Sequence, residues 1–196
     1  MAAFADYLDL KVAVADHVKN RNISDVLSRL TQAAEGWLNQ KLRMREQITA
    51  DTLTFTGGVA PLPANYLEMS AVYDALSNPM VQTSLANIKL SGSQYSQYAV
   101  DASDVYIYGL TGTRNIEYFA ALPTITSSST GSNWLLQKYP NVYLYAVGLE
   151  AAKFLRDTDI AQATDALLAR AMGDMKVNDD RARWGNATVQ LGMCTP

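Results

Sequence analysis

Histidine and cysteine, which most often carry catalysis or bind metals, occur once each among the 196 residues. His17 lies at the edge of an apolar helical stripe, where a partly buried structural histidine is the commoner role. Cys194 stands near the end of the chain and has no second cysteine to pair with, and a structural zinc site lacks its ligands. We therefore predict no disulfide, no metal site and no cofactor.

Carboxylates are the only other side chains here that could do chemistry. No Gly-x-Ser-x-Gly elbow and no glycine-rich phosphate loop occurs. A glycosidase needs only two acidic residues at a suitable separation. The glutamates that could supply them are Glu35, Glu46, Glu68, Glu117 and Glu150. A cell-wall hydrolase using two carboxylates, with Glu35 and Glu150 as the testable pair, stays an alternative function. A carbohydrate- or ligand-binding β-module using Tyr106 and Tyr108 is another.

Apolar residues spaced by three or four predict helices at both ends of the chain. The first covers 4–18, and the second begins after Asn22 as N-cap and carries an apolar stripe to about residue 42. A short helix follows Asn133. Pro140 then opens a helix to residue 156 that is apolar on more than one side. We expect that helix to be covered on more than one side and to contribute to a subunit contact.

A long final helix is predicted from Asp157 or Asp159 to Trp184, where Gly185 ends it. Its apolar stripe is expected to consist of Ile160, Ala163, Leu167, Leu168, Ala171 and Met175. In the C-terminal segment beyond it, apolar and polar residues alternate. Such a segment can add to a sheet edge, including one in another subunit.

The middle of the chain is typical of a small antiparallel β-domain. Residues 49–55 alternate apolar side chains with threonine, and Gly57 and Gly58 then predict a hairpin turn with 59–62 as the return strand. Further strands are expected at 66–76, 98–100, 105–108 and 115–119, and a short helix at 84–90. Residues 124–132 are almost all Ser, Thr or Gly, which predicts a flexible loop.

The predicted fold is therefore α+β, a four-helix bundle built from both chain ends with an inserted small antiparallel β-domain. The bundle would comprise residues 1–43 and 133–184, and the inserted domain residues 44–132. Residues 185–196 would form a C-terminal interaction tail.

Charge and hydropathy narrow the classes of partner. The net charge is −3, whereas a free-standing nucleic-acid binder is usually basic. Lys41, Arg43 and Arg45 form a basic run that marks a helix end or a phosphate contact. We find neither a signal peptide nor a membrane span, so synthesis in a reducing cytoplasm is expected.

Four ordered segments resemble tailed-bacteriophage head-tail connector (adaptor) proteins. The first is Ala33–Glu46, similar to the second-helix signature of that family, and the second is Leu62–Glu68, similar to its strand entry. The third is Asn133–Leu136 followed by Pro140 and a helix. The fourth, Arg181–Trp184, resembles the close of the last helix. Together they span nearly the whole chain.

The resemblance implies a structural, non-enzymatic protein of the virion's head-tail junction, made in the host cytoplasm. Such subunits form a homo-oligomeric ring, usually of twelve, beneath the portal protein. The ring extends the channel through which DNA passes without sequence-specific binding, and it docks a tail nozzle or tail tube protein. No membrane is involved.

The resemblance also nominates contact residues. We expect the portal-facing residues to be Trp184, Val189, Leu191 and Met193. The inserted domain would then face the tail. Candidates for inter-subunit or DNA-channel contacts are Lys41, Arg43, Arg45, Arg181 and Arg183. Tryptophan and arginine are enriched where protein interfaces concentrate their binding energy.

Overall fold

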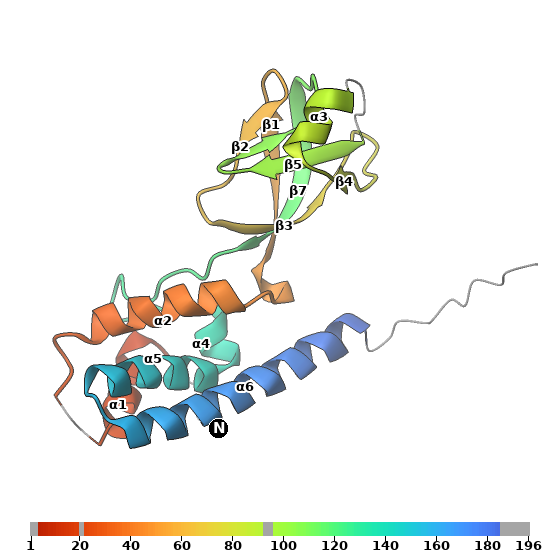
Figure 1. Ribbon diagram of the computed structural model, residues 1–196. Helices are drawn as coiled ribbons and strands as arrows, with labels where there is room; N and C mark the ends of the chain where they lie inside the picture. Colours follow the sequence, from red (N-terminus) through yellow and green to blue (C-terminus); the bar gives the residue numbers. More distant parts are fainter. Residues whose placement is uncertain (1–3, 20–21, 92–95, 185–196) are drawn as a thin grey trace, which may run out of the picture. The chain divides into compact units, whose positions relative to one another are not determined.

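The computed structural model describes residues 4–19, 22–91 and 96–184 (Figure 1). The chain divides into two compact units. The helical unit comprises residues 1–42 and 122–196, and the β-rich unit comprises residues 43–121. The predicted α+β class is confirmed, with six α-helices and two small sheets in the described residues.

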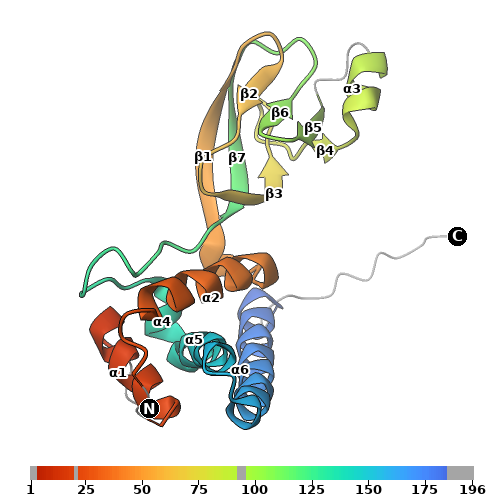
Figure 2. The ribbon, with the colours of Figure 1, turned by 60° about the vertical axis from the view of Figure 1, so that its left-hand side comes forward.

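The helical unit places four described helices around a central one. Their bounds are α1 Tyr7–His17, α2 Leu27–Lys41, α4 Trp134–Lys138, α5 Pro140–Phe154 and α6 Thr158–Trp184. Helix α5 contacts the other four, and Figure 2 shows it between α1 and α6. The predicted four-helix bundle is not confirmed, because the helices pack around α5 rather than as two antiparallel pairs.

Helix α5 is apolar on several sides because its own chain covers it on several sides. Val142, Tyr143, Val147 and Ala152 are among its buried residues. Of its large apolar side chains only Phe154 is strongly exposed. Most of the apolar surface that suggested an inter-subunit contact is therefore covered within the chain by α1, α2, α4 and α6, and the subunit contact itself stays a prediction.

Helix α6 buries Leu168 and Met175 of the predicted stripe, but its buried side is rotated from the one predicted. The buried residues are Thr164, Leu168, Met175 and Asp179, whereas Ala163 and Leu167 are exposed. Spacings of four, seven and four place these four on one side of a helix. Two of them are polar, so a stripe drawn through apolar residues alone is rotated away from the true packing side.

Local capping rules succeed at three helix starts and fail at one. Asn133 caps α4 by accepting the Leu136 N–H at 3.0 Å, and Asp157 accepts the Ile160 N–H at 3.1 Å. Pro140 opens α5 as predicted. Asn22 does not cap α2, which begins at Leu27 after an intervening turn. The turn forms because Ile23 is drawn into the core, with 3% of its surface exposed.

Two sheets and one helix build the β-rich unit. The strands are β1 Ile48–Phe55, β2 Val59–Pro61, β3 Tyr66–Val72, β4 Val81–Gln82, β5 Gln97–Asp101, β6 Asp104–Tyr106 and β7 Gly112–Ala120. One sheet has the order β1-β7-β3 and the other β2-β6-β5-β4. A 3-10 turn, η1 (Arg45–Gln47), precedes β1, and α3 (Leu85–Ser91) follows β4. Buried side chains from both sheets, among them Phe55, Ile107 and Ile116, form one core.

The glycine turn after β1 forms as predicted, but its return strand pairs elsewhere. Gly57 and Gly58 have φ values of +60° and +88°, which suits glycine. Strand β1 pairs along its length with β7, and β2 pairs with β6. Gly58 explains the departure, because its carbonyl accepts the Ile107 N–H at 2.9 Å. An added Cβ at Gly58 would lie 2.7 Å from the Ile107 carbonyl oxygen.

None of the helices in the described ranges is both long and apolar enough to traverse a bilayer.

Candidate interaction surfaces and the buried polar network

The Ser/Thr-rich segment 122–132, here called the strap, is packed onto the helices and is not the flexible loop that its composition predicted. Ile125 is completely buried. The Leu122 N–H donates to Asn39 Oδ1 of α2 at 2.8 Å, and Asn133 Nδ2 donates to the Pro123 carbonyl at 2.8 Å. The strap therefore belongs to the helical unit, whereas the sequence had assigned it to the inserted domain.

The strap also caps the N-terminus of α1. The Tyr7 N–H donates to the Gly131 carbonyl at 2.9 Å, and the Leu8 N–H donates to the Ser129 carbonyl at 3.1 Å. The first N–H groups of a helix lack partners within it. The carbonyls of the strap, together with the Asp6 side chain, supply those partners. A polar segment is thus ordered because its backbone satisfies groups that would otherwise be left unpaired.

Glu35 is the buried centre of this arrangement, with 5% of its surface exposed. Its Oε1 accepts the Ile125 N–H at 3.0 Å and the Tyr143 hydroxyl at 2.5 Å. Burial, reinforced by the nearby Glu35 charge, raises the pKa of Tyr143 well above its ordinary value. The hydroxyl therefore stays protonated and donates. Glu35 joins α2, α5 and the strap, which is a structural role that sequence reading did not identify.

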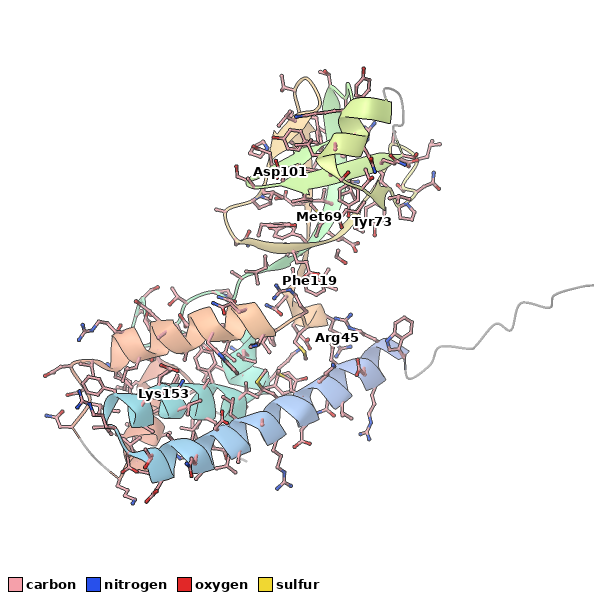
Figure 3. The ribbon with its side chains drawn as sticks, in the orientation of Figure 1. Arg45, Met69, Tyr73, Asp101, Phe119 and Lys153 are labelled. Atoms are coloured by element: carbon pink, nitrogen blue, oxygen red, sulfur yellow. The ribbon has the colours of Figure 1, made fainter. Side chains whose placement is uncertain are left out.

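Two of the other glutamates named above pair with basic side chains. Glu150 accepts from Lys153 at 2.7 Å within α5 (Lys153 is labelled in Figure 3). Glu68 accepts from Arg43 at 2.6 Å in the β-rich unit. Within the described residues, no group of three or more His, Cys, Asp or Glu side chains has the arrangement of a metal site.

His17 connects three helices. Its Nε2 lies 2.8 Å from Thr164 Oγ1 of α6, and its ring lies 5.8 Å from that of Tyr145 on α5. An added Cβ at Gly148 would come within 2.9 Å of His17 Cδ2, so that glycine leaves room for the ring. The predicted role of a partly buried histidine is consistent with these contacts. Burial lowers the pKa of His17 below its ordinary value.

The position of His17 predicts acid sensitivity. A pKa that is lower in the folded than in the unfolded chain means that the unfolded chain binds the proton more readily. The contribution of neutral His17 should be complete above about pH 6.5 and should be lost as the pH falls below it. Urea unfolding across pH 5 to 8 measures this change. His17→Gln should flatten the curve in this window, and an unchanged slope would contradict the assignment.

The five basic residues named from the sequence fall into both units. Lys41 is exposed in the last turn of α2, where positive charge complements the helix dipole. Arg43 pairs with Glu68, and Arg45 lies in η1 within 3.5 Å of Glu46 (Figure 3). Arg181 and Arg183 lie in the last turn of α6, and Arg183 bonds the buried Asp179 at 2.8 Å.

Comparison with protein families now bears on these surfaces. The family model described as SU10 adaptor protein matches residues 5–191. The chain belongs to this family. Its members are phage head-tail adaptors, so this chain is a structural component of a virion. The resemblance drawn from the four sequence segments is thereby confirmed. A search of curated proteins returned no match.

An adaptor works through the surface it offers to other proteins, and this one exposes several large apolar side chains. Trp184 is 69% exposed at the end of α6. The other nominated portal-facing residues, Val189, Leu191 and Met193, lie outside the described residues. Five more exposed apolar residues, which sequence reading did not nominate, lie on described helices of the adaptor: Leu8, Val12, Phe154, Leu167 and Val177.

Two hollows complete the candidate surfaces. One lies between α2, α5 and α6, has a volume of about 380 Å³ and is lined by Trp37, Glu150 and Asp165 among others. The second, of about 450 Å³, lies in the β-rich unit beside Tyr106 and Tyr108. The tyrosines that the sequence suggested as ligand contacts thus share one hollow.

Proposed function

We propose that this adaptor forms a ring, of twelve copies, beneath the portal protein at the head-tail junction. The ring extends the DNA channel and docks a tail nozzle or tail tube protein. The match of the adaptor family model to residues 5–191 carries the proposal. Subunits that contact their neighbours through two different faces assemble head to tail, and such an assembly closes into a ring when the rotation between neighbours permits.

The portal-facing part of the proposal rests on Trp184 and the residues after it. Trp184 is the most exposed aromatic side chain in the described part of α6, and the C-terminal segment follows it directly. Tryptophan is a frequent energetic centre of interfaces. Val189, Leu191 and Met193 alternate with polar residues, which suits a segment that adds to a sheet edge of the portal. The β-rich unit then meets the tail.

Charge supports passage of DNA without retention. Residues 43–121 contain four Lys or Arg against seven Asp or Glu. A protein surface with few Lys and Arg side chains releases few counterions from DNA and therefore binds the DNA phosphates weakly. We propose that Lys41, Arg43, Arg45, Arg181 and Arg183 serve subunit contacts or line the channel. The pairing of Arg43 with Glu68 and of Arg183 with Asp179 reduces the positive charge that these two offer to DNA phosphates.

Mass photometry of this chain mixed with the portal protein from the same genome tests the proposal. We expect a complex with one adaptor per portal chain, which is lost when residues 185–196 are deleted. Trp184→Ala should weaken binding by about 30-fold, as expected for an interface hot spot of about 2 kcal/mol. Leu76→Ala is the matched control, because Leu76 is 82% exposed but lies in the β-rich unit.

Each outcome is informative. The absence of a complex with an intact portal ring would overturn the proposal. A complex that survives both the deletion and Trp184→Ala would keep the adaptor role and reject the assigned portal-facing residues.

A further inference from the structure

Helix α1 carries an apolar face that is exposed among the residues that the structure describes. Tyr7, Leu10 and Val14 are buried on one side. On the other side Leu8 is 55% exposed and Val12 is 58% exposed, one turn apart. Asp9 and Asp16 are exposed on the same side. The outer face of α1, defined by these two apolar and two acidic residues, is an apolar centre with carboxylates beside it.

Helix α6 carries a second such face, on which arginines outnumber carboxylates. Leu167 is 40% and Val177 47% exposed. Arg170 and Arg181 are exposed on the same side, seven residues before and four residues after Val177, spacings that keep residues on one face. The outer face of α6, defined by these four residues, lies away from its buried side. Asp174, four residues after Arg170, lies on the same face, so two arginines stand there against one carboxylate.

The two outer faces are similar in length, and the carboxylates of Asp9 and Asp16, seven residues or about 10 Å apart, fall within the span of the two arginines. Helix α1 has eleven residues and is therefore about 16 Å long. Arg170 and Arg181 are eleven residues apart, which is also about 16 Å along the helix axis. Lys11 of α1 lies over the ring of the buried Tyr7 at 5.0 Å, on the inner side of the helix and away from the outer face.

The fold prevents these faces from meeting within one copy. Helices α1 and α6 both pack on α5, and Figure 2 shows them on different sides of it. Each outer face points away from α5. Two complementary faces on different sides of one molecule give a heterologous contact, which closes into a ring when the rotation between neighbours permits.

We propose that the outer face of α1 in one adaptor packs on the outer face of α6 in the next copy of the ring. This inference rests on the proposed ring and names its contact. One pair of short helices buries less than the roughly 1,200 Å² of a standard stable interface. The contact should therefore be weak between free subunits and should form when the portal brings neighbours together.

Charge reversal tests the contact on the full chain. Asp9→Lys with Asp16→Lys should place like charges together in the contact, and so should Arg170→Glu with Arg181→Glu. We expect each pair to raise the adaptor concentration for half-saturation of the portal at least tenfold. Combining all four substitutions in one chain restores opposite charges and should return saturation toward the wild-type value. A one-to-one mixture of the two double variants should do the same in an even-numbered ring.

The controls separate failure of this contact from failure of the adaptor role. Asp51→Lys with Asp101→Lys changes the net charge as much as the first variant, but on exposed residues of the β-rich unit, and should saturate the portal normally. Circular dichroism confirms that each variant is folded. If wild-type chains do not bind the portal, the proposed function has failed. If wild-type chains bind and both double variants saturate as they do, the α1–α6 contact is wrong.

Cross-linking provides a measurement that does not require the portal. Val12→Cys with Val177→Cys, in a chain that also carries Cys194→Ser, should give a ladder of oligomers with a short bis-maleimide at high protein concentration. Val12→Cys with Val81→Cys is the control, because Val81 is 62% exposed in the β-rich unit. Equal ladders from the two variants would overturn the assignment of the contact.

Discussion

Gly131→Ala should lower the free energy of unfolding by about 3 kcal/mol or more, because the strap has no room for a methyl group. An added Cβ would lie 2.1 Å from the Ile125 carbonyl oxygen and 2.8 Å from its carbonyl carbon. The neighbouring atoms are backbone, so no side-chain rotation relieves the overlap. The strap must move, and the bonds from the strap to α1 move with it.

Gly36→Ala is the matched control for this substitution. Gly36 lies exposed in the middle of α2, and no atom comes within 4 Å of an added Cβ. Alanine there should raise stability by about 0.5 to 1 kcal/mol, since it restricts the unfolded chain. Urea unfolding followed by circular dichroism measures both variants. Equal stability of the two would show that the strap tolerates movement and does not hold α1.

The strap also connects stability to assembly. Its Gly131 and Ser129 carbonyls hold the first turn of α1, the helix whose outer face we propose as a subunit contact. Gly131→Ala should therefore reduce portal saturation even under conditions in which circular dichroism shows that the chain is still folded.

Glu35→Ala should destabilise the chain by about 3 to 5 kcal/mol. The substitution removes the shared acceptor of the Tyr143 hydroxyl and the Ile125 N–H. A buried donor left without a partner costs about 1 to 3 kcal/mol, and a cavity adds to that cost. Glu35→Gln should cost less, because both hydrogen bonds go to one oxygen and an amide oxygen can also accept two.

Glu150→Ala is the control for Glu35→Ala, because it removes a glutamate from a helix without removing a buried hydrogen-bond acceptor. Glu150 lies on α5 with its side chain one-quarter exposed and pairs with Lys153 three residues away. Removing such a surface pair should change stability by about 0.5 kcal/mol or less. A double-mutant cycle of Glu35→Ala and Tyr143→Phe then isolates the pair, with an expected coupling of about 1 to 3 kcal/mol. Additive effects would mean that the two residues act independently.

Sequence alone determined the features that depend on neighbouring residues. Helix periodicity, the cap at Asn133, Pro140 at the start of α5 and the glycine turn at Gly57 and Gly58 arise from contacts within about four residues. The class of fold followed from where helical and alternating patterns occur along the chain. The adaptor family was recognisable because its motifs keep their order over nearly the whole length.

Tertiary structure decided what depends on contacts far apart in the chain. Glu35 meets Ile125 across 90 residues and Tyr143 across 108. No local pattern marks such a carboxylate as structural rather than catalytic. The strap was read as flexible because its side chains are polar, yet its order comes from backbone groups, which composition does not reveal. The exposed side of α6 was decided in the same way, by the burial of Thr164 and Asp179. Whether a polar residue is buried depends on its hydrogen-bond partners, and its residue type does not reveal them.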